Sequence, residues 1–189
     1  MSDKFVMSSR QAAELDHAFE RNGWCPEDVK WLSAGTVLTD IRSVRLGVAE
    51  IKVLEYVIDC DAAPFTPSGL KVEEHKKSGA FKWDTSPQVK LYLSQFQKKG
   101  VIGGNKLRKK LAGKPVLNAN VLDYLLAHPH LIPEEWKDKY VFFWGTIYRY
   151  SGGGLCVRYL GGDGDEWGWS CGWLDCGWSG LSPAALRAS

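Results

Sequence analysis

The chain has 189 residues, of which 44% are hydrophobic and 24% are charged, and these ordinary globular values exclude wholesale disorder. The formal net charge of +2 at pH 7 is too small to mark the whole chain as strongly basic. No run of about 18 apolar residues occurs, so we expect no transmembrane helix and no membrane partner. Residues 1–16 contain no apolar central region, which predicts a cytoplasmic protein without a signal peptide, whose five cysteines stay reduced.

Two short helices are predicted at the start of the chain. Ser8 and Gln11 have the spacing of a capping box, and apolar residues then recur at helical intervals until Asn22-Gly23. Pro26 stands where a second helix would begin, and Gly35 stands where it would end. Together these segments predict a helical hairpin.

The next segment is rich in β-branched residues. We expect a β-ribbon of two strands, about 37–46 and 48–58, that turns near Gly47. A helix is the alternative for the second of these strands.

The beginning of the middle region is poor in hydrophobic residues. Residues 70–86 therefore predict a surface excursion or a short hairpin. Ser86-Pro87 would then open a helix, because Val89, Leu93 and Phe96 form an apolar stripe at helical spacing.

Two further helices are predicted in the middle region, and the first is basic. The segment LRKKLAG, residues 107–113, predicts a short basic helix that Pro115 terminates. Asn118 or Asn120 would cap the following apolar helix, which ends before Pro129.

The final third of the chain is predicted to form β-structure. Residues 140–150, residues 155–160 and the tryptophan-rich segment WGWSCGW predict a three-stranded antiparallel meander with glycine turns. Ser182-Pro183 would start a last helical turn.

The predicted architecture is α+β, with an N-terminal helical hairpin, a β-ribbon, a helical middle and a C-terminal three-stranded antiparallel aromatic sheet. We expect three regions: 1–60 with the hairpin and the ribbon, 61–139 with the basic and mostly helical middle, and 140–189 with the tryptophan-rich sheet.

Most of the chain carries a resemblance to a known family. The run GNKLRKKLAGKPVLNANVLDYLLAHPHLIPEEWKDKYVFFWGTIYRYSGGGLCVRYL, the spaced tryptophans after it and the earlier segment LDHAFERNGWCPEDVKWLSAG resemble a family of bacterial proteins of unknown function. The resemblance implies a bacterial, intracellular setting. It implies no activity, ligand or catalytic residue.

Six of the nine tryptophans lie in the last 54 residues. Trp167, Trp169 and Trp173 share one parity, so a strand would place them on one face, either as a packing surface or as a platform that stacks sugars, nucleobases or a peptide. The packing surface is favoured, and Trp178, which is off this parity, is the expected exposed anchor. The predicted function is non-catalytic binding of a protein or peptide partner through an aromatic set: Trp144, Trp167, Trp169, Trp173 and Trp178.

A basic stretch supports a second hypothesis. Between Lys71 and Lys114, twelve basic residues stand against three acidic ones. The cations within residues 98–114 could bind the phosphates of a nucleic acid. A run of lysines more often forms the solvent-exposed face of a helix. The candidate phosphate-binding residues are Lys98, Lys99, Lys106, Arg108, Lys109, Lys110 and Lys114.

A small enzyme is the third hypothesis. Cys156 or Cys171 could act as nucleophile with His128 as base and Asp175 as orienting group, but a chain of this length offers such a trio by chance. No C-x-x-C pair, helical H-x-x-x-H or phosphate-cradling glycine loop occurs, so we expect no metal site and no cofactor.

Overall fold

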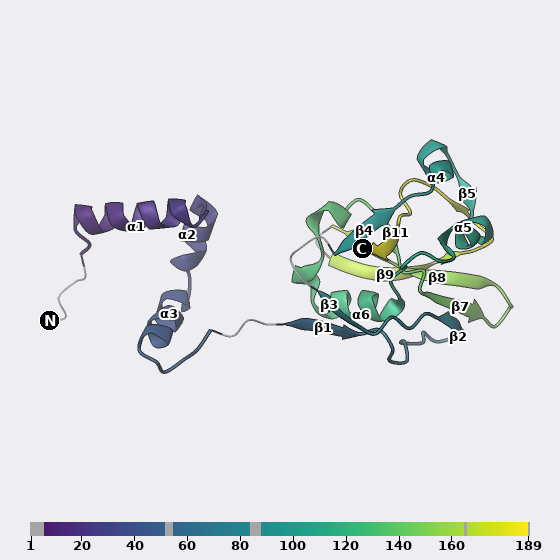
Figure 1. Ribbon diagram of the computed structural model, residues 1–189, viewed down its shortest axis with the longest axis horizontal. Coiled ribbons are helices and arrows are strands. Elements are labelled where there is room, and N and C mark those ends of the chain that lie inside the picture. Colours follow the sequence, from purple (N-terminus) through teal and green to yellow (C-terminus); the bar gives the residue numbers. More distant parts are fainter. Residues whose placement is uncertain (1–5, 52–54, 84–87, 165, 189) are drawn as a thin grey trace. The chain divides into compact units, whose positions relative to one another are not determined.

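The computed structural model describes residues 6–51, 55–83, 88–164 and 166–188. The chain divides into two compact units, Met1–Leu54 and Glu55–Ser189. The described part of the first unit is helical, and the second unit mixes helices and strands (Figure 1). The α+β class is therefore confirmed for the chain as a whole.

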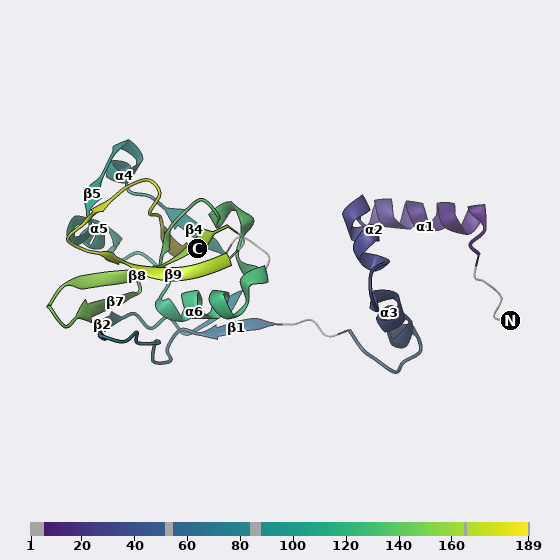
Figure 2. The same ribbon diagram turned by 180° about the vertical axis from the view of Figure 1, so that it is seen from behind.

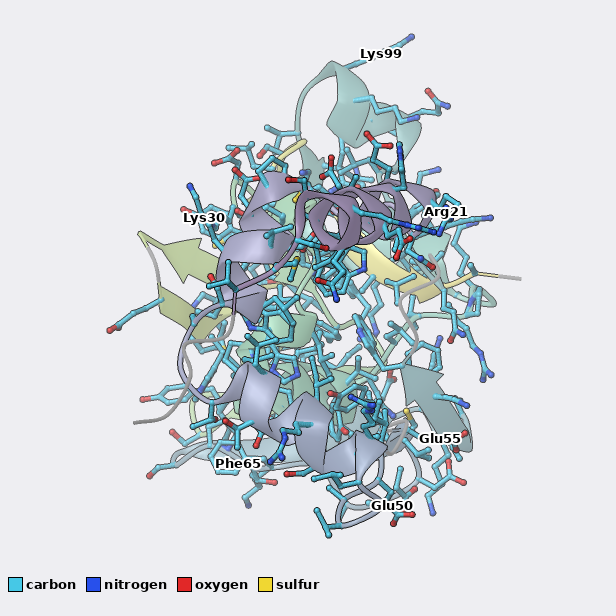
Figure 3. The ribbon with its side chains drawn as sticks, turned by 90° about the vertical axis from the view of Figure 1, so that its left-hand side faces the viewer. Arg21, Lys30, Glu50, Glu55, Phe65 and Lys99 are labelled. Carbon is cyan, nitrogen blue, oxygen red and sulfur yellow. The ribbon has the colours of Figure 1, made fainter. Side chains whose placement is uncertain are left out.

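The first unit contains α1 (Ser9–Arg21), α2 (Pro26–Leu32) and α3 (Val37–Arg45). The capping box is present, since the Ser8 hydroxyl accepts from the Gln11 N–H and the Gln11 side chain accepts from the Ser8 N–H. None of the three helices contains a buried residue. Charged side chains such as Arg21 and Lys30 extend away from their helices (Figure 3).

The predicted β-ribbon is wrong. Val37, Leu38 and Ile41 also follow a helical repeat, and local hydrogen bonds close a helix there rather than a strand. Of the second predicted strand, residues 52–54 lie outside the described residues. Among its described residues, those at its end form a strand, β1 (Tyr56–Asp59), and β1 pairs with β3 (Ala80–Trp83) instead of with residues 37–46.

A seven-stranded sheet forms the centre of the second unit. Its strands are ordered β2-β7-β8-β6-β11-β4, with β9 paired to β8. The long strand β8 carries β9 along one edge, and β7 and then β6 along the other. The bounds are β2 (Leu70–His75), β4 (Val89–Tyr92), β6 (Val141–Phe142), β7 (Thr146–Tyr150), β8 (Leu155–Asp163), β9 (Glu166–Trp173) and β11 (Ala184–Arg187).

Helices cover both faces of the β8–β9 pair. α6 lies on one side of the pair, and α4 and α5 lie on the other, as both views of the ribbon show (Figures 1 and 2). A second small ribbon pairs β5 with β10 near α5. The bounds are α4 (Gln95–Lys99), β5 (Ile102–Gly103), α5 (Gly104–Leu111), α6 (Ala119–Ala127), two 3₁₀ turns (Pro129–Leu131 and Glu134–Trp136) and β10 (Gly177–Trp178).

The sheet corrects several expectations. The predicted helix start at Ser86-Pro87 lies outside the described residues, and residues 89–92 form β4, because that segment pairs with β11. The last residues form β11 itself rather than a helical turn. The predicted single strand 140–150 is wrong, because the chain forms two strands there, β6 and β7. β7, β8 and β9 follow one another, but they belong to a sheet of seven, since strands from residues 61–139 join it.

Two apolar clusters sandwich the sheet. One joins α6 residues such as Leu122 and Leu125 to Phe143 and Leu160, and the other joins α5 to Val157 and several aromatic rings. No helix among the described residues is long and apolar enough to cross a bilayer.

Candidate functional site

Strand β9 lies at an edge of the sheet, because β8 is the one described strand to which it pairs. The Leu174 N–H donates to the Leu155 carbonyl at 2.8 Å, which marks a hydrogen-bonded pair of the β8–β9 ladder. Such pairs alternate along an antiparallel ladder, so the even-numbered residues of β9 bond to β8. The backbone groups of Trp167, Trp169 and Cys171 therefore point away from β8. No hydrogen bond joins them to any described part of the chain.

The odd-numbered side chains of β9 form one face of the edge. Trp169 and Trp173 are each 40% exposed, so tryptophans of the predicted binding set do reach the surface. The Phe65 ring packs edge-on against Trp169 at 6.3 Å, and the Tyr150 ring packs edge-on against Trp173 at 5.8 Å. We call these four exposed rings the aromatic band.

The opposite face of β9 carries small residues, and at Gly172 aromatic rings pack directly against the backbone. A Cβ at Gly172 would lie 2.7 Å from a ring carbon of Phe142 and 2.9 Å from a ring carbon of Trp178. Trp178 is only 3% exposed and Trp144 is also buried. The predicted exposed anchor at Trp178 is therefore wrong: the chain turns back after Trp173, and the β10–β5 pair holds the Trp178 indole inside.

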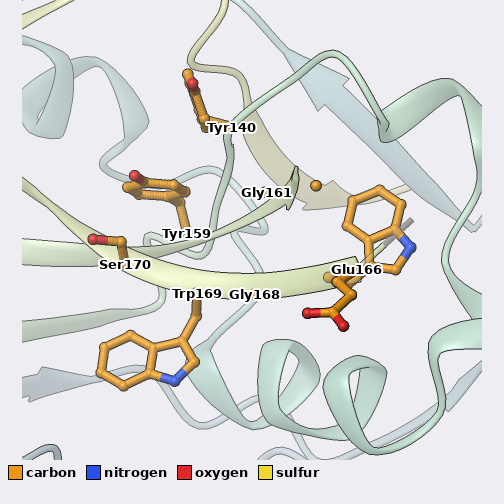
Figure 4. A pocket seen from close by; sticks show the side chains of 9 residues that line it. Tyr140, Tyr159, Gly161, Glu166, Gly168, Trp169 and Ser170 are labelled. Atoms are coloured by element: carbon orange, nitrogen blue, oxygen red, sulfur yellow. The ribbon is translucent and has the colours of Figure 1, made fainter. Parts of the chain in front are cut away.

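A hollow of about 500 Å³ lies at the other end of β9. Figure 4 shows Tyr140, Tyr159 and Ser170 on one side of the strand and Trp169 on the other. The Gly168 position faces open space, since no atom lies within 4 Å of where its Cβ would be. We call this the tyrosine hollow, and its lining is Tyr140, Tyr159, Gly161, Gly162, Glu166, Trp167, Gly168, Trp169 and Ser170.

A buried arginine supports the aromatic band from below. Arg158 of β8 is 1% exposed, and its guanidinium donates to both carboxylate oxygens of Asp123 on α6, at 3.0 and 2.6 Å. The guanidinium carbon lies 4.2 Å from the Trp169 ring centroid and 5.2 Å from that of Phe65. These cation–π contacts hold the Trp169 ring in one orientation.

The charge of Arg158 is secure in this environment. Burial lowers the pKa of the guanidinium, but its hydrogen bonds with Asp123 and Tyr148 outweigh burial, so the pKa lies above its usual value. Burial raises the pKa of the Tyr148 hydroxyl, which donates to the Phe65 carbonyl at 2.9 Å. Arg158 is thus a permanent cation beneath the band. Sequence reasoning missed it, although a lone charge among the apolar residues of LCVRYL is a usable signal.

The cations of residues 98–114 are divided between α4, α5 and the loop after α5. Arg108 is ion-paired with Glu74. The ammonium of Lys110 lies 5.0 Å from the Phe96 ring centroid, and that of Lys114 lies 4.7 Å from the Tyr92 centroid. Three of the seven predicted phosphate contacts thus have partners within the chain, while the remaining four are Lys98, Lys99, Lys106 and Lys109.

The nucleophile, base and orienting group of the enzyme hypothesis make separate contacts. His128 bonds to the Tyr124 carbonyl and stacks on the Tyr124 ring at 4.3 Å. The Asp175 carboxylate accepts from Asn105. Among the described residues, no hydrogen bond or ion pair links either group to Cys156 or Cys171.

Comparisons with protein-family models, with curated proteins and with solved structures found no match to this chain. Any function assigned to the site therefore rests on its geometry and chemistry.

Proposed function

We propose that the protein binds an extended peptide segment, which adds to the sheet as a strand along β9. The observation that carries this proposal is the outward-facing row of backbone donors and acceptors at Trp167, Trp169 and Cys171. An added strand would satisfy these groups with main-chain hydrogen bonds, as in other cases of β-augmentation. We retain the bacterial cytoplasm as its proposed setting.

The two faces of the edge strand would contact alternate side chains of the peptide. Residues that point to one side would enter the tyrosine hollow, where Gly168 leaves room for them. Residues that point to the other side would lie along the aromatic band, where exposed indoles offer large rigid surfaces at a low cost in conformational entropy. The alternation of an added strand thus matches the arrangement of β9.

The chemistry of the hollow favours a basic side chain in the peptide. The Tyr140 and Tyr159 rings pack edge-on at 5.2 Å, and Glu166 is the acidic residue among those that line the hollow. Aromatic faces and a carboxylate together attract a lysine or arginine head group. We therefore expect the preferred segment to carry a cation that reaches the hollow.

Nucleic acid is supported less well. Arg108, Lys110 and Lys114 would have to leave their ion pair or aromatic partners before they could contact phosphates. No aromatic residue interrupts the lysines of α5 to stack on bases, and an acidic partner would be repelled from the hollow.

The test is a selection of twelve-residue peptides from a random display library on the full chain, followed by anisotropy titrations with the best binders. Gly168→Lys places a cation in the hollow and should weaken binding at least tenfold, whereas the matched Gly168→Ala should change it less than twofold. Lys106→Gln with Lys109→Gln should have no effect.

Hydrogen exchange separates strand addition from other modes of binding. The amides of Trp169 and Cys171 face outward and should gain protection when the peptide is bound. Peptide binding without this protection, or a library that yields no binder, would refute strand addition. Binding of a labelled oligonucleotide that is lost in the double lysine variant would instead support the nucleic-acid hypothesis.

A further inference from the structure

Two cysteines lie side by side beneath the aromatic band. In the β8–β9 register, Cys156 is opposite Trp173 and Cys171 is opposite Arg158, so the two thiols are diagonal neighbours on one face of the sheet. Cys171 packs against the buried cluster that contains Cys156 and Tyr148. Both cysteines are free thiols.

The two thiols differ in their exposure. Cys156 is completely buried, whereas Cys171 is half-buried and lies in sequence between the exposed Trp169 and Trp173. Cys171 is therefore the more accessible of the two thiols to a small oxidant from solvent.

The surroundings also assign the two thiols different charge states. The neighbouring Cys156 thiol, together with the positive charge of Arg158, lowers the pKa of Cys171 despite its burial. The neighbouring Cys171 and burial raise the pKa of Cys156. Arg158 has one further donor to offer, because its buried Nε has no partner among the described residues. A thiolate is the nucleophilic form of cysteine, so Cys171 is the reactive member of the pair.

We propose that Cys171 and Cys156 form a reversible thiol pair that is oxidised by hydroperoxides. The Cys171 thiolate attacks the terminal oxygen of the hydroperoxide, an S–O bond forms, the O–O bond breaks, and the leaving alkoxide takes up a proton to become an alcohol, or water when the oxidant is hydrogen peroxide. Cys156 then attacks the sulfenic sulfur of Cys171, so that a disulfide forms and water leaves. One hydroperoxide is reduced by two electrons as two thiols are oxidised.

The register makes this disulfide easy to reduce. Diagonal neighbours in an antiparallel pair have Cα atoms about 7–8 Å apart, whereas disulfides span about 4.4–6.8 Å. Closing the bond must draw β8 and β9 together, and a disulfide formed under such strain has a more oxidising potential than a structural one. Oxidation therefore acts as a reversible modification of the edge strand. It does not depend on whether the edge binds a peptide.

The test treats the reduced full chain with one equivalent of hydrogen peroxide and maps the products by peptide mass spectrometry. We expect a loss of two mass units, a Cys156–Cys171 crosslink and recovery of both thiols with dithiothreitol. In Cys156→Ser, the sulfenic acid should persist and dimedone should label Cys171. The exposed Cys25 and Cys176 serve as internal controls, and Cys171 should react at least tenfold faster than either.

Two results would overturn the proposal: oxidation of Cys171 at the rate of the exposed controls, or a disulfide that joins any other pair. The wild-type crosslink map needs no substitution, so a variant that fails to fold leaves the test intact.

Discussion

Replacement of Trp178 by alanine tests the arrangement of the C-terminal tryptophans most directly. The Trp178 ring lies 4.2 Å from the Phe142 centroid and 4.7 Å from the Trp144 centroid. Its Nε1 donates to the Trp173 carbonyl at 3.2 Å. Trp178→Ala therefore removes a ring from the interior of the second unit together with a hydrogen bond to the end of β9.

The expected cost follows from the buried area. A buried tryptophan removes roughly 200 Å² from water, which at about 25 cal/mol per Å² amounts to about 5 kcal/mol. Truncations of buried Phe or Trp to Ala typically cost about 3–5 kcal/mol, and within that range the cost rises with the volume of the cavity that stays open. Since domains are stable by about 5–15 kcal/mol, Trp178→Ala should leave the second unit only marginally folded.

The matched control is Trp173→Ala, which removes an indole that is 40% exposed from the same part of the chain. We expect this variant to lose about 1 kcal/mol, the usual size for a partly exposed site. Urea unfolding followed by circular dichroism gives both free energies, because tryptophan fluorescence itself changes with these substitutions. Equal losses in the two variants would refute the burial of Trp178.

Three further predictions concern β8, β9 and α6. Asp123→Ala should lower the free energy of unfolding by about 3–5 kcal/mol in the same assay, because it leaves the charge of its arginine partner buried and unpaired; a loss below about 1 kcal/mol would contradict that burial. Gly172→Ala should lower the free energy of unfolding by about 1–3 kcal/mol through overpacking. Gly168→Ala should lower it by less than about 0.5 kcal/mol, the usual limit for a surface substitution. The reverse order of the two losses would refute the close packing at Gly172. Iodoacetamide should label Cys171 at lower pH than an ordinary thiol, because its lowered pKa keeps it a thiolate there. Cys156→Ala should move the midpoint of the labelling profile upward and Cys156→Ser should restore it, whereas an unmoved midpoint in Cys156→Ala would show that Cys156 does not lower the pKa of Cys171.

Local signals were sufficient for the helices α1, α5 and α6. Ser8 and Asn118 each cap the helix that follows, and these hydrogen bonds act within three residues. The basic segment after Gly104 also forms a helix as predicted. A cap depends on neighbours in sequence, so sequence alone can reveal it.

Pairing between strands that are distant in the sequence could not be predicted in the same way. The stripe of Val89, Leu93 and Phe96 has helical spacing, yet Val89 pairs with Arg187 in the sheet and Phe96 is exposed. A partner almost a hundred residues away decided the conformation, and no local pattern identifies that partner. For the same reason, the predicted sheet contained three strands where the structure has seven.

In the candidate site, too, the sequence predicted local features but not long-range contacts. The parity of Trp167, Trp169 and Trp173 correctly placed them on one face. The burial of Trp178 depends on the β10–β5 pairing, which could not be predicted from the sequence. Likewise, the lone charge of Arg158 signals a buried partner, but only the packing of α6 identifies Asp123 as that partner.

Two different reasons explain the glycines of β9, and the difference bears on where a partner would bind. Gly172 is required by close packing, since Phe142 and Trp178 occupy the space of a side chain. Gly168 has no such neighbour, so packing within the described chain does not explain it. Edge strands are commonly protected by lysine, proline or a covering element, and the sequence EWGWSCGW contains neither lysine nor proline. An unprotected edge with open space at Gly168 is what a strand needs if a partner is to cover it.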